Sequence, residues 1–130
     1  MYDTANNYNL QVIITSGHEA PHRALAGFAL ALSAVASGLK VVVWLTMYGV
    51  QWAGKNPASH EIIPGFISIA EHIQQLNEAN VRIEVCPTCR EQGNMLSGTG
   101  CGLGRPWNNY APAGLATIVS RLTTVPTVTF

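Results

Sequence analysis

The sequence predicts a three-layer α/β fold, with a mostly parallel sheet and helices on both of its faces. Short apolar runs rich in β-branched residues alternate with segments whose apolar residues recur every three or four positions. Such alternation builds strand–helix–strand units, which make parallel sheets. The run at residues 40–45 is apolar almost throughout, which is typical of a strand covered on both faces. The chain of 130 residues is long enough for a core, and we expect a single domain over residues 1–130.

Four segments are predicted to be strands, because each is a short run of mainly β-branched or other apolar residues. They are residues 10–15, 40–45, 81–85 and 125–130. The last of them contains Pro126, which cannot donate a backbone hydrogen bond and therefore favours an edge or the start of a strand. Residues 49–63 and 93–111 are expected to be loops, since they are mixed in composition or rich in Gly, Asn, Pro and Ser.

Three helices are predicted from apolar residues that recur at helical spacing. The first covers residues 22–37, the second has Pro64 near its first turn, and the third is opened by Pro112. Gly38 and Asn80 are expected to end the first two helices in the left-handed conformation. The residues expected on the buried faces are Leu25, Phe28, Ala29, Leu32 and Val35, then Phe66, Ile69, Ala70, Ile73 and Leu76, and finally Leu115, Ile118, Val119 and Leu122.

Charged side chains are scarce in this sequence. They make up 11% of the residues, whereas globular domains average about 25%. Seven basic and seven acidic residues give a formal net charge of zero without any basic run, so we expect no nucleic acid as a partner. So few charges leave apolar surface to bury, and we expect a homo-oligomer. Trp44, Tyr48 and Trp52 are expected in the core or at that subunit interface.

Residues 24–50 carry one charge, at Lys40, and are apolar enough to suggest a membrane span. Gly38 and Lys40 interrupt the stretch, and its pattern changes there from helix-like to strand-like, so we expect no membrane partner. The first nine residues lack the basic and apolar regions of a signal peptide. Three cysteines, an odd number, do not form a disulfide framework. We therefore expect a cytoplasmic protein with free thiols.

The expected chemistry lies where the third strand ends, at Cys86. Open parallel sheets bind ligands beyond the carboxyl ends of their strands. Pro87 suits the first position of a helix, so the Cys86 sulfur would lie near free backbone N–H groups, which favour a thiolate. Arg90 adds a nearby positive charge. We therefore expect Cys86 to be the most reactive thiol, the alternative being that it is a small buried apolar residue.

Cys89 and Cys101 are further candidate catalytic residues. Cys89 could close a redox disulfide with Cys86, or it could point into the core. A zinc site completed by Cys101 with His60 or His72 would be indicated by a second Cys-x-x-Cys or a His-x-x-x-His pattern. The chain has neither pattern, so no metal is expected.

The glycine-rich segment at residues 98–104 lacks the spacing of a phosphate-binding loop, and no strand precedes it as the dinucleotide fingerprint requires. We therefore expect no cofactor. The segment is interpreted as a flexible loop, and its glycines could allow Cys101 to approach Cys86.

Three residues are candidates for binding a substrate at the carboxyl edge of the sheet, namely His18, Gly49 and Arg90. Each lies in or beside a loop that follows a predicted strand. His18 could supply a proton or a positive charge near Cys86, the alternative being a contact at a helix end.

The order of these pieces resembles the DsrE/DsrF-like family, which includes the sulfur-relay subunits of the TusBCD and DsrEFH complexes. The resemblance covers nearly the whole chain. It rests on the opening strand and alanine-rich helix, on residues 41–50 (VVVWLTMYGV), on residues 83–89 (IEVCPTC), and on a last helix and strand that end at Phe130. It implies a flavodoxin-like sheet and assembly into trimers or hexamers.

In sulfur-relay members of that family, the cysteine at the end of this strand accepts sulfane sulfur as a persulfide and passes it on. The resemblance implies that role for Cys86, with sulfur donor and acceptor proteins as partners. Cys89 and Cys101 are not required by the relay pattern. The predicted function is therefore a sulfur carrier or sulfurtransferase-like protein. Two alternatives stay open: a thiol–disulfide oxidoreductase using Cys86 and Cys89, and a non-catalytic oligomer that binds a small ligand.

Overall fold

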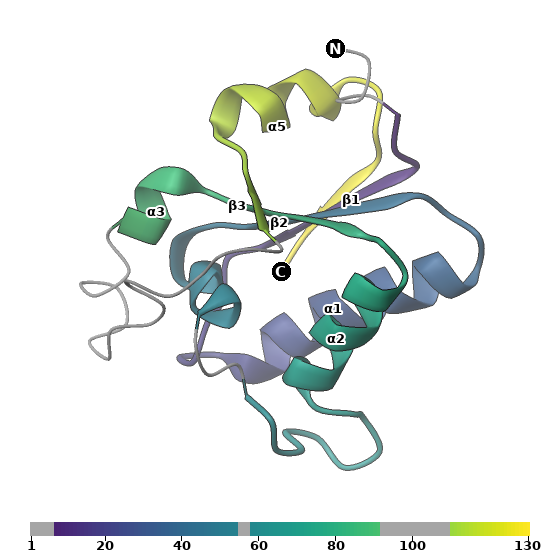
Figure 1. Cartoon of the computed structure of the whole chain (residues 1–130), viewed down its shortest axis with the longest axis vertical. Coiled ribbons are helices and arrows are strands. Elements are labelled where there is room, and N and C mark those ends of the chain that lie inside the picture. The colour runs from purple at the N-terminus through teal and green to yellow at the C-terminus, as the bar shows by residue number, and fades with distance from the viewer. Residues whose placement is uncertain (1–6, 55–57, 92–109) are drawn as a thin grey trace.

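The computed structural model describes residues 7–54, 58–91 and 110–130 (Figure 1). Its elements are, in chain order, β1 (Leu10–Ile14), α1 (Pro21–Ala36), β2 (Val41–Leu45), η2 (Met47–Ala53), α2 (Ile69–Glu78), β3 (Arg82–Val85), α3 (Pro87–Glu91), β4 (Tyr110–Pro112), α5 (Leu115–Leu122) and β5 (Thr127–Thr129). The element η2 is a 3-10 helix.

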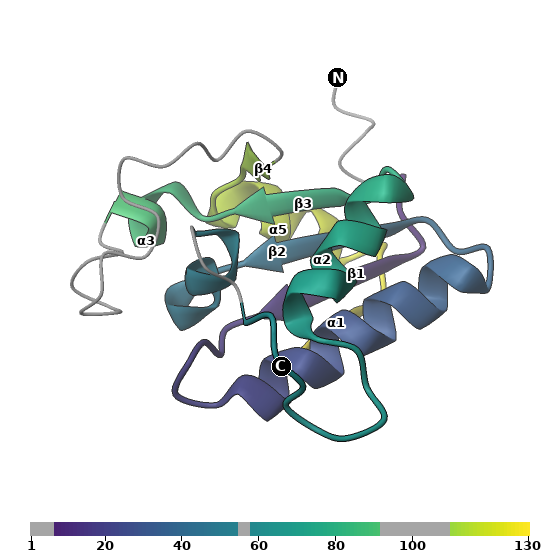
Figure 2. The ribbon, with the colours of Figure 1, turned by 60° about the horizontal axis from the view of Figure 1, so that its bottom comes forward.

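In the described part of the chain the strands form one five-stranded sheet in the order β4-β3-β2-β1-β5, and every neighbouring pair is parallel. α1 and α2 cover one face of this sheet, while α5 crosses the other face (Figures 1 and 2). The predicted α/β fold with helices on both faces is therefore confirmed. β5 lies at an edge, where Pro126 was expected to put it.

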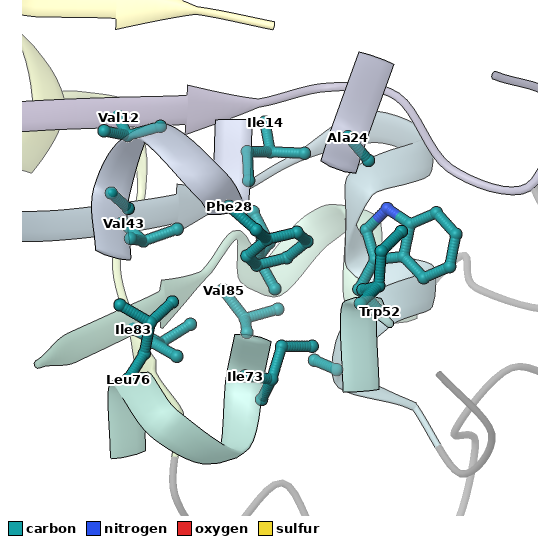
Figure 3. Packing of buried hydrophobic residues seen from close by; sticks show 14 of the residues in the cluster. Val12, Ile14, Ala24, Phe28, Val43, Trp52, Ile73, Leu76, Ile83 and Val85 are labelled. Carbon is teal, nitrogen blue, oxygen red and sulfur yellow. The ribbon is translucent and has the colours of Figure 1, made fainter. Parts of the chain in front are cut away.

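The main apolar core lies between the sheet and the pair α1 and α2 (Figure 3). Val12 and Ile14 of β1 point into it together with Val43 of β2, because alternate residues of a strand face the same side. Phe28 of α1 and Trp52 of η2 fill the space between the elements, and all five side chains are fully buried. This core fixes the face of the sheet on which α1 and α2 lie.

The turns after the first two helices follow the prediction. Gly38 and Asn80 have φ angles of 89° and 61°, which is the left-handed conformation expected at the ends of these helices. The loop predicted at residues 49–63 is partly wrong, because its first residues belong to η2. Two of the three aromatic residues considered for a subunit interface, Trp44 and Trp52, are buried within the chain itself, and Tyr48 is 41% exposed.

The second helix begins later than predicted. Pro64 lies outside it, because Ser68 caps the helix and accepts the backbone N–H of Glu71 at 3.1 Å. Phe66 precedes this cap and is 46% exposed, so its predicted burial is wrong. Ile73, in contrast, lies in the core as predicted.

The C-terminal part differs most from the prediction. Pro112 does not open a helix but ends β4, a three-residue strand that was not predicted. Tyr110 of β4 pairs with β3, and β4 is the outermost strand of the described sheet, a position in which a proline is tolerated.

The helix α5 also buries a different face from the one predicted. Leu115, Val119 and Leu122 are 70%, 58% and 50% exposed, and only Ile118 of the predicted set is buried. The second buried residue of α5 is Arg121, because the sheet beneath the helix contains a buried carboxylate that this cation pairs with. Apolar spacing alone therefore assigned the wrong rotation to α5.

Candidate functional site

The carboxyl ends of β1, β2 and β3 lie together at one edge of the sheet, because the strands are parallel and in register. Cys86 directly follows β3, and its backbone N–H donates to the carbonyl oxygen of Leu45 at 2.9 Å. Pro87 is the first residue of α3, as predicted. The chain leaves β2 toward α2 on one face and leaves β4 toward α5 on the other (Figure 1). The cysteine turn lies beyond the carboxyl end of β3, on the edge of the sheet where open α/β folds bind ligands.

Cys86 is buried on the α5 side of the sheet. Its side chain is 8% exposed and belongs to a small apolar cluster with Trp44, Ala113 and Ile118. Trp44 donates its indole N–H to the carbonyl oxygen of Ala113 at 2.8 Å, which ties the chain before α5 to β2. No hydrogen bond reaches the Cys86 sulfur from the residues that the structure describes. The thiol expected to be the most reactive is therefore the better shielded of the two described cysteines.

Cys89 is half-buried, and its sulfur faces the start of η2. The backbone N–H of Met47 donates to Cys89 Sγ at 3.2 Å, and Thr46 Oγ1 lies 3.5 Å from the same atom. Met47 has a φ of 53°, a backbone conformation that is uncommon for residues with a side chain and concentrates at functional sites. Thr46 and Met47 thus bring hydrogen-bond donors to a cysteine sulfur, a contact that the sequence did not predict.

Of the predicted substrate-binding residues, His18 lies in the turn between β1 and α1 and is exposed. Its backbone N–H donates to Gln51 Oε1 at 2.7 Å, and its ring lies 4.6 Å from that of Trp52. Gly49 is buried inside η2, and a Cβ atom there would come 2.1 Å from the carbonyl oxygen of Ile14. His18 therefore contacts η2, and Gly49 lies where η2 packs closely against β1.

Arg90 lies in α3, but its side chain is outside the described part of the structure, and Cys101 is outside the described residues altogether. His60 is exposed, and His72 is buried with Nδ1 2.9 Å from the carbonyl oxygen of Ser68. Within residues 7–54, 58–91 and 110–130, no group of three or more His, Cys, Asp or Glu side chains could hold a metal ion. No helix among the same residues is long and apolar enough to cross a membrane.

A buried ion pair lies beneath α5 on the same face of the sheet as Cys86. Glu84 of β3 accepts two hydrogen bonds from the guanidinium of Arg121, at 2.6 and 2.7 Å, and both side chains are almost fully buried. Gln11 of β1 accepts a further bond from Arg121 at 3.2 Å, and Arg82 donates to the second Glu84 oxygen at 2.7 Å. The hydrogen bond to Glu84 is the main reason that the pKa of Arg121 is raised.

Sequence reasoning missed this ion pair. The signal was present in Glu84, a charged residue in the middle of a predicted strand, because a carboxylate that is buried in a sheet requires a partner. The partner could not be identified from the sequence, since Arg121 was assigned no position on the inner face of its helix.

The matched region of a family model includes the whole cysteine turn. The model described as the DsrE/DsrF-like family matches residues 9–103. The chain belongs to the DsrE/DsrF-like family. This match confirms the family that was predicted from the order of the sequence motifs. The family is generally related to sulfur relay.

Among solved structures, the DsrE/DsrF-like chain is similar to the ychN protein from E. coli, which is known from a crystal structure. The similarity has a TM-score of 0.68 at 17% sequence identity and covers 95% of this chain and 99% of that chain. At this identity the likeness concerns the fold. No curated protein matches the chain in sequence.

Proposed function

We propose that this DsrE/DsrF-like protein is a sulfur carrier that accepts sulfane sulfur as a persulfide on Cys86 and passes it to an acceptor protein. The observation that carries the proposal is the pair of free thiols at the carboxyl end of β3, where Cys86 and Cys89 lie on one turn. Free thiols of this kind suit a reducing compartment such as the cytoplasm.

Loading is a thiol-exchange reaction. The thiolate of Cys86 attacks the outer sulfur of a donor persulfide, R–S–SH, and the sulfur–sulfur bond of the donor breaks. The donor leaves as the thiolate R–S⁻, and Cys86 keeps the –SH group as Cys86–S–SH. One sulfur atom has moved, and no further oxidant or reductant is needed. The apolar neighbours Trp44 and Ile118 would keep water and small reductants from the bound persulfide.

Release can follow two routes. An acceptor thiolate can attack the outer sulfur and restore the Cys86 thiolate. Alternatively, the Cys89 thiolate attacks the inner sulfur, which forms a Cys86–Cys89 disulfide and expels HS⁻, so that two cysteines are oxidised while the sulfane sulfur is reduced. The second route is supported by the Met47 N–H and the Thr46 hydroxyl at Cys89 Sγ, since an anionic sulfur accepts such hydrogen bonds more strongly than a neutral one.

The test is mass spectrometry of reduced protein after incubation with polysulfide. We expect sulfur to be added in steps of one atom, with the first on Cys86 by peptide mapping. Cys86→Ser should abolish this addition, because a serine hydroxyl is far too weakly acidic to accept sulfane sulfur. Cys89→Ser should still load, but should release HS⁻ more slowly. Loading of Cys86→Ser to the wild-type level would refute the assignment.

The same two thiols support a second candidate, a thiol–disulfide oxidoreductase. The two functions differ in what Cys89→Ser does. A carrier keeps its loaded sulfur without Cys89, whereas an oxidoreductase loses all turnover of a partner dithiol in both Cys86→Ser and Cys89→Ser. Dithiol turnover without any sulfur loading would favour the oxidoreductase.

We also propose that the protein assembles into a homo-oligomer, a trimer or hexamer as the family resemblance implies. The outer side of α5 supports the proposal, because Leu115, Val119 and Leu122 recur at helical spacing and are at least half exposed. Light scattering should give a mass that is a multiple of 13.9 kDa, and Val119→Glu should lower it by placing a charge in the stripe. A wild-type mass of 13.9 kDa at high protein concentration would contradict the proposal.

A further inference from the structure

The inner face of α5 and the face of β3 beneath it carry matching pairs of residues. Glu84 and Cys86 are two positions apart on the β3 segment and therefore face the same side. Ile118 and Arg121 are three positions apart on α5 and are its two buried residues. Ile118 packs in the cluster that contains Cys86, and Arg121 binds Glu84. Ile118 therefore packs near the Cys86 thiol, and Arg121 joins α5 to β3.

The ion pair holds α5 in one position and one rotation. Arg121 binds both oxygens of Glu84 in a two-pronged arrangement, which fixes the direction as well as the distance of the guanidinium. Gln11 of β1 accepts from Arg121 and in turn donates to Thr127 Oγ1 of β5 at 3.1 Å. Arg121 is therefore connected to three strands of the sheet.

Among the described residues, Ile118 is the apolar residue through which α5 packs on the sheet. Leu115, Val119 and Leu122 are at least half exposed, so within the described part of the chain they add little apolar burial to α5. Replacing a buried ion pair by apolar residues is often neutral or stabilising, so stability alone gives little reason for one here. The charges do, however, determine which face of α5 lies against the sheet.

We infer that Glu84 and Arg121 are positioning residues that hold Ile118 over Cys86 and thereby control access to this thiol. The inference rests on the proposed function, in which Cys86 carries a persulfide that must survive until the acceptor arrives. With α5 in place, small thiols reach the Cys86 persulfide slowly. When α5 is displaced, Cys86 both reacts and loses its sulfur faster.

The test is the alkylation rate of each cysteine in the folded protein, read by peptide mapping and expressed as the ratio of Cys86 to Cys89. Arg121→Met removes the ion pair but leaves Arg82 to neutralise Glu84. Ile118→Ala removes the cover and keeps the ion pair. We expect the ratio to rise at least about tenfold in both variants, which corresponds to ~1.4 kcal/mol of opening free energy.

Ser120→Ala is the matched control, because it changes an exposed residue of the same helix that belongs neither to the buried pair nor to the Leu115, Val119 and Leu122 stripe. Its ratio should equal that of the wild type. The rate at Cys89 serves as an internal monitor, since global unfolding would raise both rates together. The lifetime of the loaded persulfide against glutathione should shorten in Arg121→Met and stay unchanged in Ser120→Ala.

Two results would overturn the inference. An unchanged ratio in both test variants would show that α5 does not cover Cys86. A ratio that rises in Ile118→Ala alone would remove the positioning role of Glu84 and Arg121. Failure of the proposed function looks different. In that case Arg121→Met would alkylate rapidly at Cys86 and still take up no sulfur from polysulfide.

Discussion

Replacing Gly49 by alanine would place a methyl group against the backbone of β1. The Cβ atom would lie 2.1 Å from the carbonyl oxygen of Ile14 and 2.9 Å from its carbonyl carbon. Ordinary van der Waals contacts between a Cβ atom and another heavy atom are longer than about 3.4 Å, so η2 and β1 would have to separate by more than an ångström. Overpacking costs about 1–3 kcal/mol, and here the obstacle is backbone rather than a flexible side chain. We therefore expect Gly49→Ala to lower the free energy of unfolding by ~3 kcal/mol.

Urea unfolding measures this loss. With a slope of about 1.5 kcal/mol per molar urea, the midpoint should fall by about 2 M. Separating η2 from β1 would also disturb the surroundings of Cys89. The Gly49 N–H donates to the carbonyl oxygen of Thr46 at 2.8 Å, and Met47, which follows Thr46, donates its backbone N–H to the Cys89 sulfur. We expect a changed alkylation rate at Cys89 in the folded variant.

Gly114→Ala is the control for this experiment. A Cβ atom at Gly114 meets no described atom within 4 Å, and the φ of −94° at Gly114 suits any residue. Its effect on stability should stay within about 1 kcal/mol, since a gain in chain entropy is opposed by a weaker helix cap. Equal urea midpoints for Gly49→Ala and the wild type would refute the close approach of η2 to β1.

Two further predictions concern buried polar groups. Glu84→Gln should destabilise the fold by up to ~3–5 kcal/mol, because it removes the carboxylate that pairs with the buried Arg121. Arg121→Met should destabilise it less, because Arg82 still pairs with Glu84. In urea unfolding the double variant should lose less than the sum of the two single losses, and additive losses would show that the two side chains are not coupled. Burial raises the pKa of the Tyr110 hydroxyl above its usual 10.0. The tyrosine therefore ionises in the unfolded chain before it ionises in the folded protein. The stability that the neutral hydroxyl contributes is fully present below pH 10.0 and is lost as the pH rises through the folded-state pKa. Tyr110→Phe should flatten the decline of stability at alkaline pH, and equal slopes in both proteins would contradict the assignment.

Much of the fold and the location of the site followed from local sequence signals. The alternation of residues 10–15 and 40–45 with a helical segment was sufficient to predict parallel strands, because side-chain periodicity reports which faces are covered. Gly38 and Asn80 marked helix ends, because few residues adopt a positive φ. Cys86 and the proline after it marked the strand-to-helix turn at the carboxyl edge.

The details of the site came from contacts between distant parts of the chain. Met47 N–H and Cys89 Sγ are separated by 42 positions, and Arg121 and Glu84 by 37. No local pattern relates such residues, and the apolar spacing of α5 pointed to the exposed Val119 rather than to Arg121.

The sequence by itself determined the fold class, the family and the position of the cysteine turn, because periodicity, turn residues and motif order are properties of neighbouring residues. Only the tertiary structure decided which thiol is shielded. Cys86 is covered because the buried charge of Glu84 draws Arg121, and with it one face of α5, onto the sheet. Cys89 is half-buried beside the N–H of Met47 in η2, the element that packs closely on β1 at Gly49. Both outcomes depend on packing between elements, which one-dimensional patterns do not encode.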